Sequence, residues 1–176
     1  MSLLNIPTLE NASGEVKIIF DEIQNMIGMV PNGIRLWSAN PKALKDQWNH
    51  IKETLSLDKD TQKLHAILRY LVSEENLCSY CTGFNAGMLL TLYETTQDEL
   101  KNLNTDLSSA VLNPKNKKLL IFAMKSIKNA DSITSNDIES LKEAGITEKE
   151  LFDIVHYASH MGTVNTLFKT FKVQQD

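Results

Sequence analysis

The chain has 176 residues, of which 42% are hydrophobic and 23% are charged, and its formal net charge is −4 at pH 7. These values are typical of a globular domain, exclude a disordered chain, and lack the basic excess expected of a nucleic-acid-binding protein. No apolar run approaches the roughly 20 residues of a membrane span, and the N-terminus carries no signal-peptide pattern. We therefore expect a single cytoplasmic domain over residues 1–176, without nucleic-acid or membrane partners.

Apolar residues recur at steps of three and four along most of the chain, which predicts amphipathic helices. The first is capped by Ser13 and ended by Gly28, and a loop follows over residues 29–33. Asn40-Pro41 and Asn113-Pro114 each pair a capping side chain with a proline in the first turn. The expected helices lie at about residues 16–27, 41–55, 60–73, 78–92, a short segment after 96, 114–127, 134–144 and 147–168.

The later helices carry further start signals. Thr96 with Glu99, and Thr147 with Glu150, have the spacing of capping boxes. No segment shows the sustained two-residue alternation that is typical of a half-buried strand. The predicted fold class is all-α.

Cys78-Ser79-Tyr80-Cys81 contains the only two cysteines of the chain. At 3.6 residues per turn, positions 78, 81 and 85 fall within an arc of about 60°, so both sulfurs share a helix face with Asn85. Amides and the dipole at a helix start stabilise a thiolate, which makes one sulfur a nucleophile and the other its resolving partner. The alternative is a pair of buried cysteines that act as small hydrophobic residues.

The segment around this motif resembles the active-site segment of the carboxymuconolactone decarboxylase superfamily, in its alkylhydroperoxidase D-like branch. The family segment has a helix that ends in Val-Ser, an Asn-Gly turn and then Cys-x-Tyr-Cys. Leu71–Cys81 resembles it at Val72-Ser73, at Asn76 and at Cys78-Ser79-Tyr80-Cys81. The likeness extends over nearly the whole chain. It includes Val30-Pro31-Asn32, Asn40-Pro41, the stretch from Asn113 to Val155, and Asn165 with Leu167.

The resemblance implies an all-α, AhpD-like helical bundle whose subunits assemble as homotrimers or homohexamers. It also implies that the cysteine pair reduces hydroperoxides and is regenerated by a dithiol carrier, such as a lipoyl-bearing or thioredoxin-like protein. The family pattern places a glutamate twelve residues before the first cysteine and a histidine four after the second. Those positions hold Ala66 and Asn85 here, and an asparagine can donate a hydrogen bond but cannot act as a general base.

Several residues near the motif are candidates to replace this relay. Glu74, slightly favoured over Glu75, lies just before the pair, and Tyr80 supplies a phenol within it. His65 neighbours position 66, although consecutive helix residues point about 100° apart. Alternatively, the two glutamates interact with the helix dipole or face solvent.

No other cluster predicts a cofactor or metal site. His156 and His160 lie four apart, but no nearby carboxylate set completes a metal site, and we expect an exposed pair or a subunit contact. The apolar residues Phe84, Met88 and Leu89 are expected in the core or in a subunit interface.

Three functions follow from these observations. The first is an antioxidant thiol peroxidase or disulfide reductase for small organic hydroperoxides, weakened by the loss of the relay. The second is a non-catalytic or redox-sensing oligomer, and the third, less favoured, is a lactone decarboxylase. The helix start favours Cys78 as the attacking sulfur, whereas exposure and proximity to Asn85 favour Cys81.

Overall fold

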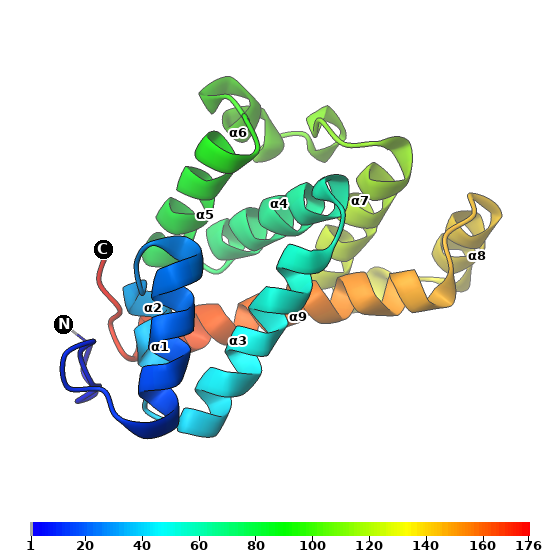
Figure 1. The fold of residues 1–176 in the computed structure, drawn as a ribbon. Coiled ribbons are helices and arrows are strands. Elements are labelled where there is room, and N and C mark those ends of the chain that lie inside the picture. The colour runs from blue at the N-terminus through cyan, green and yellow to red at the C-terminus, as the bar shows by residue number, and fades with distance from the viewer. Residues whose placement is uncertain (1) are drawn as a thin grey trace. The chain divides into compact units, whose positions relative to one another are not determined.

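The computed structural model describes residues 2–176, and these are helical with no β-strand, which confirms the all-α prediction. The chain divides into two compact units: one comprises the chain up to Leu57 together with Leu167–Asp176, and the other comprises Asp58–Thr166. The single domain expected over residues 1–176 stays a prediction. The helices of this part of the chain are α1 Gly14–Ile27, α2 Asn32–Trp37, α3 Pro41–Ser56, α4 Lys59–Glu75, α5 Ser79–Leu92, α6 Gln97–Leu103, η1 Leu107–Ser109, α7 Pro114–Lys128, η2 Ala130–Ser132, α8 Ser135–Glu143 and α9 Glu148–Thr170 (Figure 1).

The capping residues read from the sequence mark the observed helix ends, although the Ser13 side chain makes no capping hydrogen bond at the start of α1. Gly28 ends α1 in the left-handed conformation, with φ of 87°. The Asn40 side chain accepts a hydrogen bond from the Ala43 amide at the start of α3, and Thr96 and Glu99 form the capping box of α6. By contrast, α2 overlaps the loop predicted over residues 29–33 and was missed, since six residues are too few to show a helical period.

The first unit has its own apolar core, in which α3 packs on α1 and α2. Trp48 of α3 is 1% exposed, and its indole Nε1 donates to Glu22 Oε2 at 2.7 Å. Met26 and Ile27 continue the apolar pattern of α1 but are exposed, because they lie in its last turn beyond the contact with α3. The core residues are Ala12, Val16, Ile19, Phe20, Ile23, Val30, Leu44 and Trp48.

The second unit is organised around α4, which packs against both α5 and α7. Its buried apolar residues are Leu64, Ala66, Ile67, Leu68, Tyr70, Leu71 and Val72. Leu120 and Ala123 of α7 are fully buried, as is Ala158 of α9. This packing fixes the end of α4, from which the cysteine motif begins.

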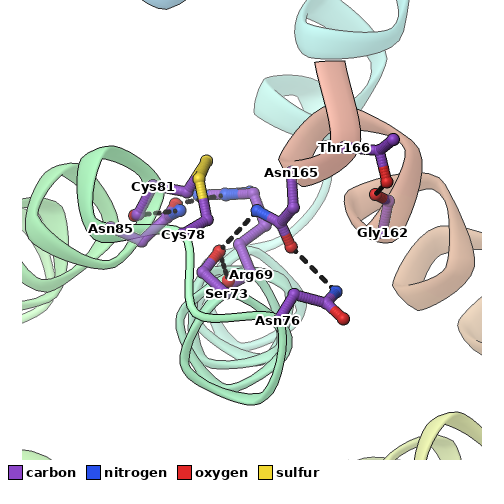
Figure 2. Close-up of a disulfide and its surroundings, with 9 residues drawn as sticks. All are labelled: Arg69, Ser73, Asn76, Cys78, Cys81, Asn85, Gly162, Asn165 and Thr166. Carbon is purple, nitrogen blue, oxygen red and sulfur yellow. Dashed lines mark hydrogen bonds between the residues drawn. A yellow bond between two sulfur atoms is a disulfide. The ribbon is translucent and has the colours of Figure 1, made fainter. Parts of the chain in front are cut away.

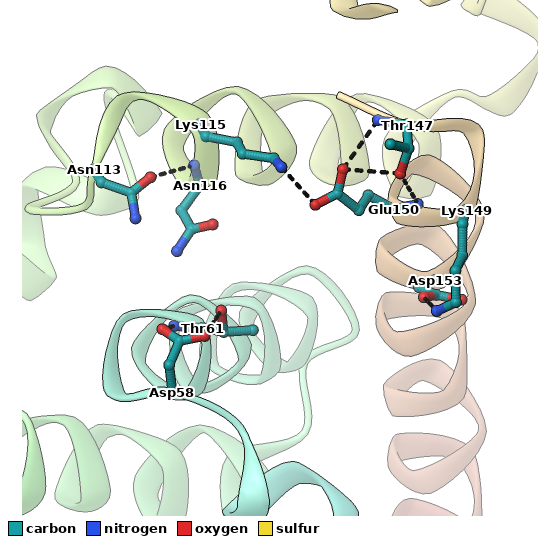
Figure 3. A network of polar contacts seen from close by, with 9 residues as sticks. All are labelled: Asp58, Thr61, Asn113, Lys115, Asn116, Thr147, Lys149, Glu150 and Asp153. Atoms are coloured by element: carbon teal, nitrogen blue, oxygen red, sulfur yellow. Dashed lines mark hydrogen bonds and ion pairs between the residues drawn. The ribbon is translucent and has the colours of Figure 1, made fainter. Parts of the chain in front are cut away.

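A polar network joins the first turns of α7 and α9 within the second unit (Figure 3). Lys115 Nζ lies 2.6 Å from Glu150 Oε1, and Glu150 also accepts hydrogen bonds from the backbone and hydroxyl of Thr147. The Lys115 ammonium and the Thr147 amide hold the pKa of Glu150 at about 2. None of the helices formed by residues 2–176 is long and apolar enough to cross a membrane.

Candidate active site

The cysteine motif follows a sharp turn at the end of α4. Leu77 has φ of 53°, a left-handed conformation that favours glycine, and its side chain is 83% exposed. The Leu77 amide donates to Glu74 O and the Cys78 amide donates to Ser73 O, both at 3.0 Å. The turn thus brings Cys78 back over the last turn of α4.

Cys78 and Cys81 form a disulfide, with their Cα atoms 5.4 Å apart, and each residue is 2% exposed. Cys78 is the N-cap residue of α5, and no side chain makes a capping hydrogen bond there. In the reduced protein, a Cys78 thiolate stands where a capping oxygen would accept hydrogen bonds from the first-turn amides. The geometry thus suits reversible dithiol chemistry.

Asn85 connects Cys81 to a buried polar cluster (Figure 2). The Asn85 side chain donates to Cys81 O at 2.8 Å and accepts from Arg69 Nε at 2.9 Å. Arg69 Nη1 donates to the Tyr157 hydroxyl at 2.5 Å, and its Nη2 faces the Met88 sulfur at 4.0 Å. Arg69 therefore ties α4 to both α5 and α9.

Two further ring side chains belong to this cluster. The His65 ring stacks on Tyr157, with centroids 3.8 Å apart. Burial raises the pKa of Tyr93 and the nearby Tyr157 adds to that rise, whereas the positive charge of Arg69 opposes it. A chain of contacts links His65 to the Cys81 backbone: His65 stacks on Tyr157, Tyr157 accepts from Arg69, and Arg69 donates to Asn85, which donates to the Cys81 carbonyl.

A second network holds the turn itself (Figure 2). Asn165 of α9 is 1% exposed, and its side chain donates to Ser73 Oγ at 3.1 Å and accepts from Asn76 Nδ2 at 3.0 Å. Ser73 Oγ in turn donates to Arg69 O at 2.6 Å. Since the Ser73 carbonyl accepts from the Cys78 amide, Asn165 positions the segment that carries Cys78.

The remaining candidates lie apart from the sulfurs or act as packing residues. The Glu74 side chain is half-buried and makes no hydrogen bond or ion pair with the rest of residues 2–176. Glu75 is directed toward α7, where it pairs with Lys128 at 3.3 Å. Tyr80 is 5% exposed and stacks on Phe84, and Ala66 is fully buried.

No sequence motif points to Arg69 or Tyr157, which complete the first of these networks. Arg69 and Tyr157 each stand alone in a helix, without a motif around them, whereas Ser73 and Asn165 were singled out only by the family resemblance. Tyr157 is 88 residues from Arg69 in the chain, so only the packing of α9 on α4 brings them together. One sequence feature could have indicated Arg69: it is a charged residue that directly follows Leu68 of the apolar stripe of α4.

His156 and His160, the histidine pair considered in the sequence, both lie on α9. His156 is exposed and stacks on Phe152, and His160 is half-buried. Among residues 2–176, no group of three or more histidine, cysteine, aspartate or glutamate side chains could hold a metal ion.

The chain matches no protein-family model and no curated protein sequence. It does resemble solved structures. One is a Ralstonia eutropha JMP134 protein described as an alkylhydroperoxidase AhpD core and an uncharacterized peroxidase-related protein, with 23% identity, a TM-score of 0.81, and coverage of 99% of this chain and 92% of that one. An uncharacterized peroxidase-related protein from Silicibacter sp. TM1040 has 20% identity with the same TM-score and coverage. At these identities the likeness shows the fold, and it confirms the predicted AhpD-like architecture.

Proposed function

We propose that the chain is an AhpD-like member of the carboxymuconolactone decarboxylase superfamily and that its Cys78–Cys81 dithiol reduces small organic hydroperoxides. The observation that carries this proposal is the cysteine pair, closed as a disulfide at the start of α5. Both the fold and the peroxidase-related descriptions of its structural neighbours support it.

The reaction requires two thiols and one peroxide. A cysteine thiolate attacks the terminal peroxide oxygen, so that an S–O bond forms, the O–O bond breaks, and the leaving alkoxide takes a proton to become an alcohol. The second thiol then attacks the sulfenic sulfur, forming the disulfide and releasing water. The two thiols together lose the two electrons that reduce the hydroperoxide.

We assign the attack to Cys78 and the resolving step to Cys81. The two residues are equally buried, so exposure does not favour Cys81. Cys78 occupies the N-cap position of α5, where first-turn amides stabilise a thiolate. The side chain of Asn85 donates to the Cys81 carbonyl, not to a sulfur, and so holds the backbone of the resolving residue.

No side chain described above is placed to act as a general acid or base at the cysteines. Asn85 does not titrate, the Glu74 carboxylate makes no hydrogen bond to either cysteine, and His65 lies beyond Tyr157. Losing a general acid or base typically costs about 10²–10⁴-fold in rate. We therefore expect slow turnover.

The disulfide must be reduced again for a second turnover. A dithiol carrier, either lipoyl-bearing or thioredoxin-like, is the reductant that we propose, because two successive exchange steps return both cysteines to thiols. We also propose a homotrimer or homohexamer. Its support is α5, which is apolar on most sides and leaves Phe84 36% and Leu92 62% exposed.

The test is closure of the disulfide in reduced protein after addition of cumene hydroperoxide, followed by mass spectrometry over seconds. Because the chain has only two cysteines, an intramolecular disulfide can form only between Cys78 and Cys81. We expect a closure rate proportional to peroxide concentration, and a sulfenic acid trapped in Cys81→Ser but not in Cys78→Ser. Closure no faster than that of a free dithiol at the same pH would refute peroxidase function.

A redox-sensing role without turnover is the second candidate. The burial of both cysteines, at 2% exposure each, favours it because a buried pair exchanges slowly with bulky partners. A sensor should close its disulfide with peroxide but show no steady-state peroxide consumption with lipoyl or thioredoxin-type reductants. Lactone decarboxylation, in contrast, should survive replacement of both cysteines by serine.

A further inference from the structure

Arg69 is a half-buried cation with no carboxylate partner. Its hydrogen-bonding neighbours are the amide of Asn85, the hydroxyl of Tyr157 and, more distantly, the sulfur of Met88, all of them neutral. No aspartate or glutamate of residues 2–176 forms an ion pair with it. The second unit therefore holds an uncompensated positive charge beside its disulfide.

Such an arrangement is unfavourable for stability taken alone. Removing a charge from water is costly unless an opposite charge compensates for it. Lysines of the same unit are compensated in the usual way: Lys115 and Lys125 lie at the surface and form ion pairs with Glu150 and Asp137. Arg69 instead makes close hydrogen bonds with two of its five N–H donors and retains its charge uncompensated.

The anion that this charge can compensate arises when the disulfide is reduced. Asn85 donates to the Cys81 carbonyl and accepts from Arg69 Nε, which places the guanidinium two hydrogen bonds from the Cys81 backbone. The disulfide is neutral, whereas a reduced pair at a helix start carries a thiolate. A thiolate on this pair would share a largely buried site with the guanidinium, and charges in such a site are poorly screened.

We propose that Arg69, held by Asn85 and Tyr157, is a positioning residue that favours the thiolate form of the reduced Cys78–Cys81 pair. The role of this cation in turnover rests on the proposed function, but its effect on the thiols does not. Arg69 accepts no proton: the thiol releases its proton to solvent, and the permanent guanidinium charge stabilises the thiolate that remains. The chain would thus replace a proton relay by a fixed charge.

Other titratable side chains face the same cluster. His65 of α4 stacks on Tyr157 of α9, and Tyr93, after α5, interacts electrostatically with both Arg69 and Tyr157. Tyr80 lies within the motif itself on α5. None of these groups is a carboxylate, and Glu74, the carboxylate nearest to Arg69 in the chain, forms no ion pair with it among residues 2–176.

The test is a titration of the thiols by their thiolate ultraviolet absorbance in fully reduced protein. The Cys78→Ser/Cys81→Ser protein supplies the tyrosine background, and because the thiols are coupled, the first macroscopic pKa is compared. We expect that Arg69→Gln raises this pKa by about one unit or more, toward the free-cysteine value of about 8.5. Arg69→Lys should stay nearer to the parent protein, since the charge is retained.

A charge-matched control separates a local effect from net charge. Lys118→Gln removes one positive charge from an exposed position of α7 in the same unit and should leave the thiol pKa unchanged. An unchanged pKa in folded Arg69→Gln, checked by circular dichroism, would overturn the proposal. An equal rise in Lys118→Gln would do the same.

A second pair of variants keeps Arg69 in place, in case Arg69→Gln does not fold. Met88→Glu brings a carboxylate to the position that now faces Nη2 of Arg69, and Met88→Gln is its neutral match. We expect Met88→Glu to raise the thiol pKa and Met88→Gln not to; no difference between them would refute the proposal. Since no peroxide is used, a protein without peroxidase activity still gives an answer.

Discussion

Replacing Asn165 by alanine should loosen the segment that carries Cys78. The change removes two hydrogen bonds, to Ser73 Oγ at 3.1 Å and from Asn76 Nδ2 at 3.0 Å, at a residue that is only 1% exposed. Each lost hydrogen bond contributes about 0.5–1.5 kcal/mol net, and buried groups left unsatisfied add to the loss. We expect a destabilisation of about 2–3 kcal/mol, or roughly 5–10 °C in Tm for a chain of this length.

Circular dichroism during heating and urea titration of the oxidised protein measure this loss. Thr166→Ala is the matched control, because Thr166 lies on the same helix but is exposed and bonds only to the local Gly162 carbonyl. The free energy of unfolding of this control should stay within about 0.5 kcal/mol of the parent protein's value. If Asn165→Ala also fell within that range, Asn165 would not be the residue that holds the turn.

Three further predictions concern stability. Leu77→Gly should stabilise the protein by about 1 kcal/mol in urea titration, because φ of 53° strains a leucine. Glu150→Gln should flatten the dependence of Tm on pH. In the parent protein, Lys115 is the main cause that lowers the pKa of Glu150 from 4.5 to about 2, so the stability that this ionised carboxylate contributes above pH 4.5 is lost as the pH falls toward 2. The glutamine cannot titrate and so lacks this contribution. Trp48→Phe should cost about 1–3 kcal/mol in urea titration by removing the hydrogen bond to Glu22 and leaving unfilled volume.

Each of these predictions has a control. Leu92→Gly, at the exposed last residue of α5, should lower the free energy of unfolding by up to about 1 kcal/mol, and a similar loss for Leu77→Gly would contradict the strain argument. A Glu150→Gln protein with the acid sensitivity of its parent would show that the Lys115 pair does not contribute. Glu22→Gln retains an acceptor for Trp48, so a loss as large as that of Trp48→Phe would assign the effect to the carboxylate charge.

The helices could be predicted because their signals are local. The caps at Asn40, Thr96 and Asn113 act on backbone amides within three residues, and each marks a helix start in the structure. The apolar spacing that predicted a helix over residues 60–73 corresponds in α4 to buried Leu64, Ile67, Leu68 and Leu71. The short α2 escaped prediction since its six residues span less than two turns.

The sequence by itself determined the cysteine pair, because four consecutive residues set the spacing of two sulfurs at a helix start. It also placed Asn85 on the same face, one turn after Cys81. The surroundings were decided by tertiary structure alone. Arg69 lies on α4, whereas Tyr157 and Asn165 lie on α9, far along the chain. The hydrogen bonds from these two α9 residues to Arg69 and Ser73 exist only once α9 packs on α4.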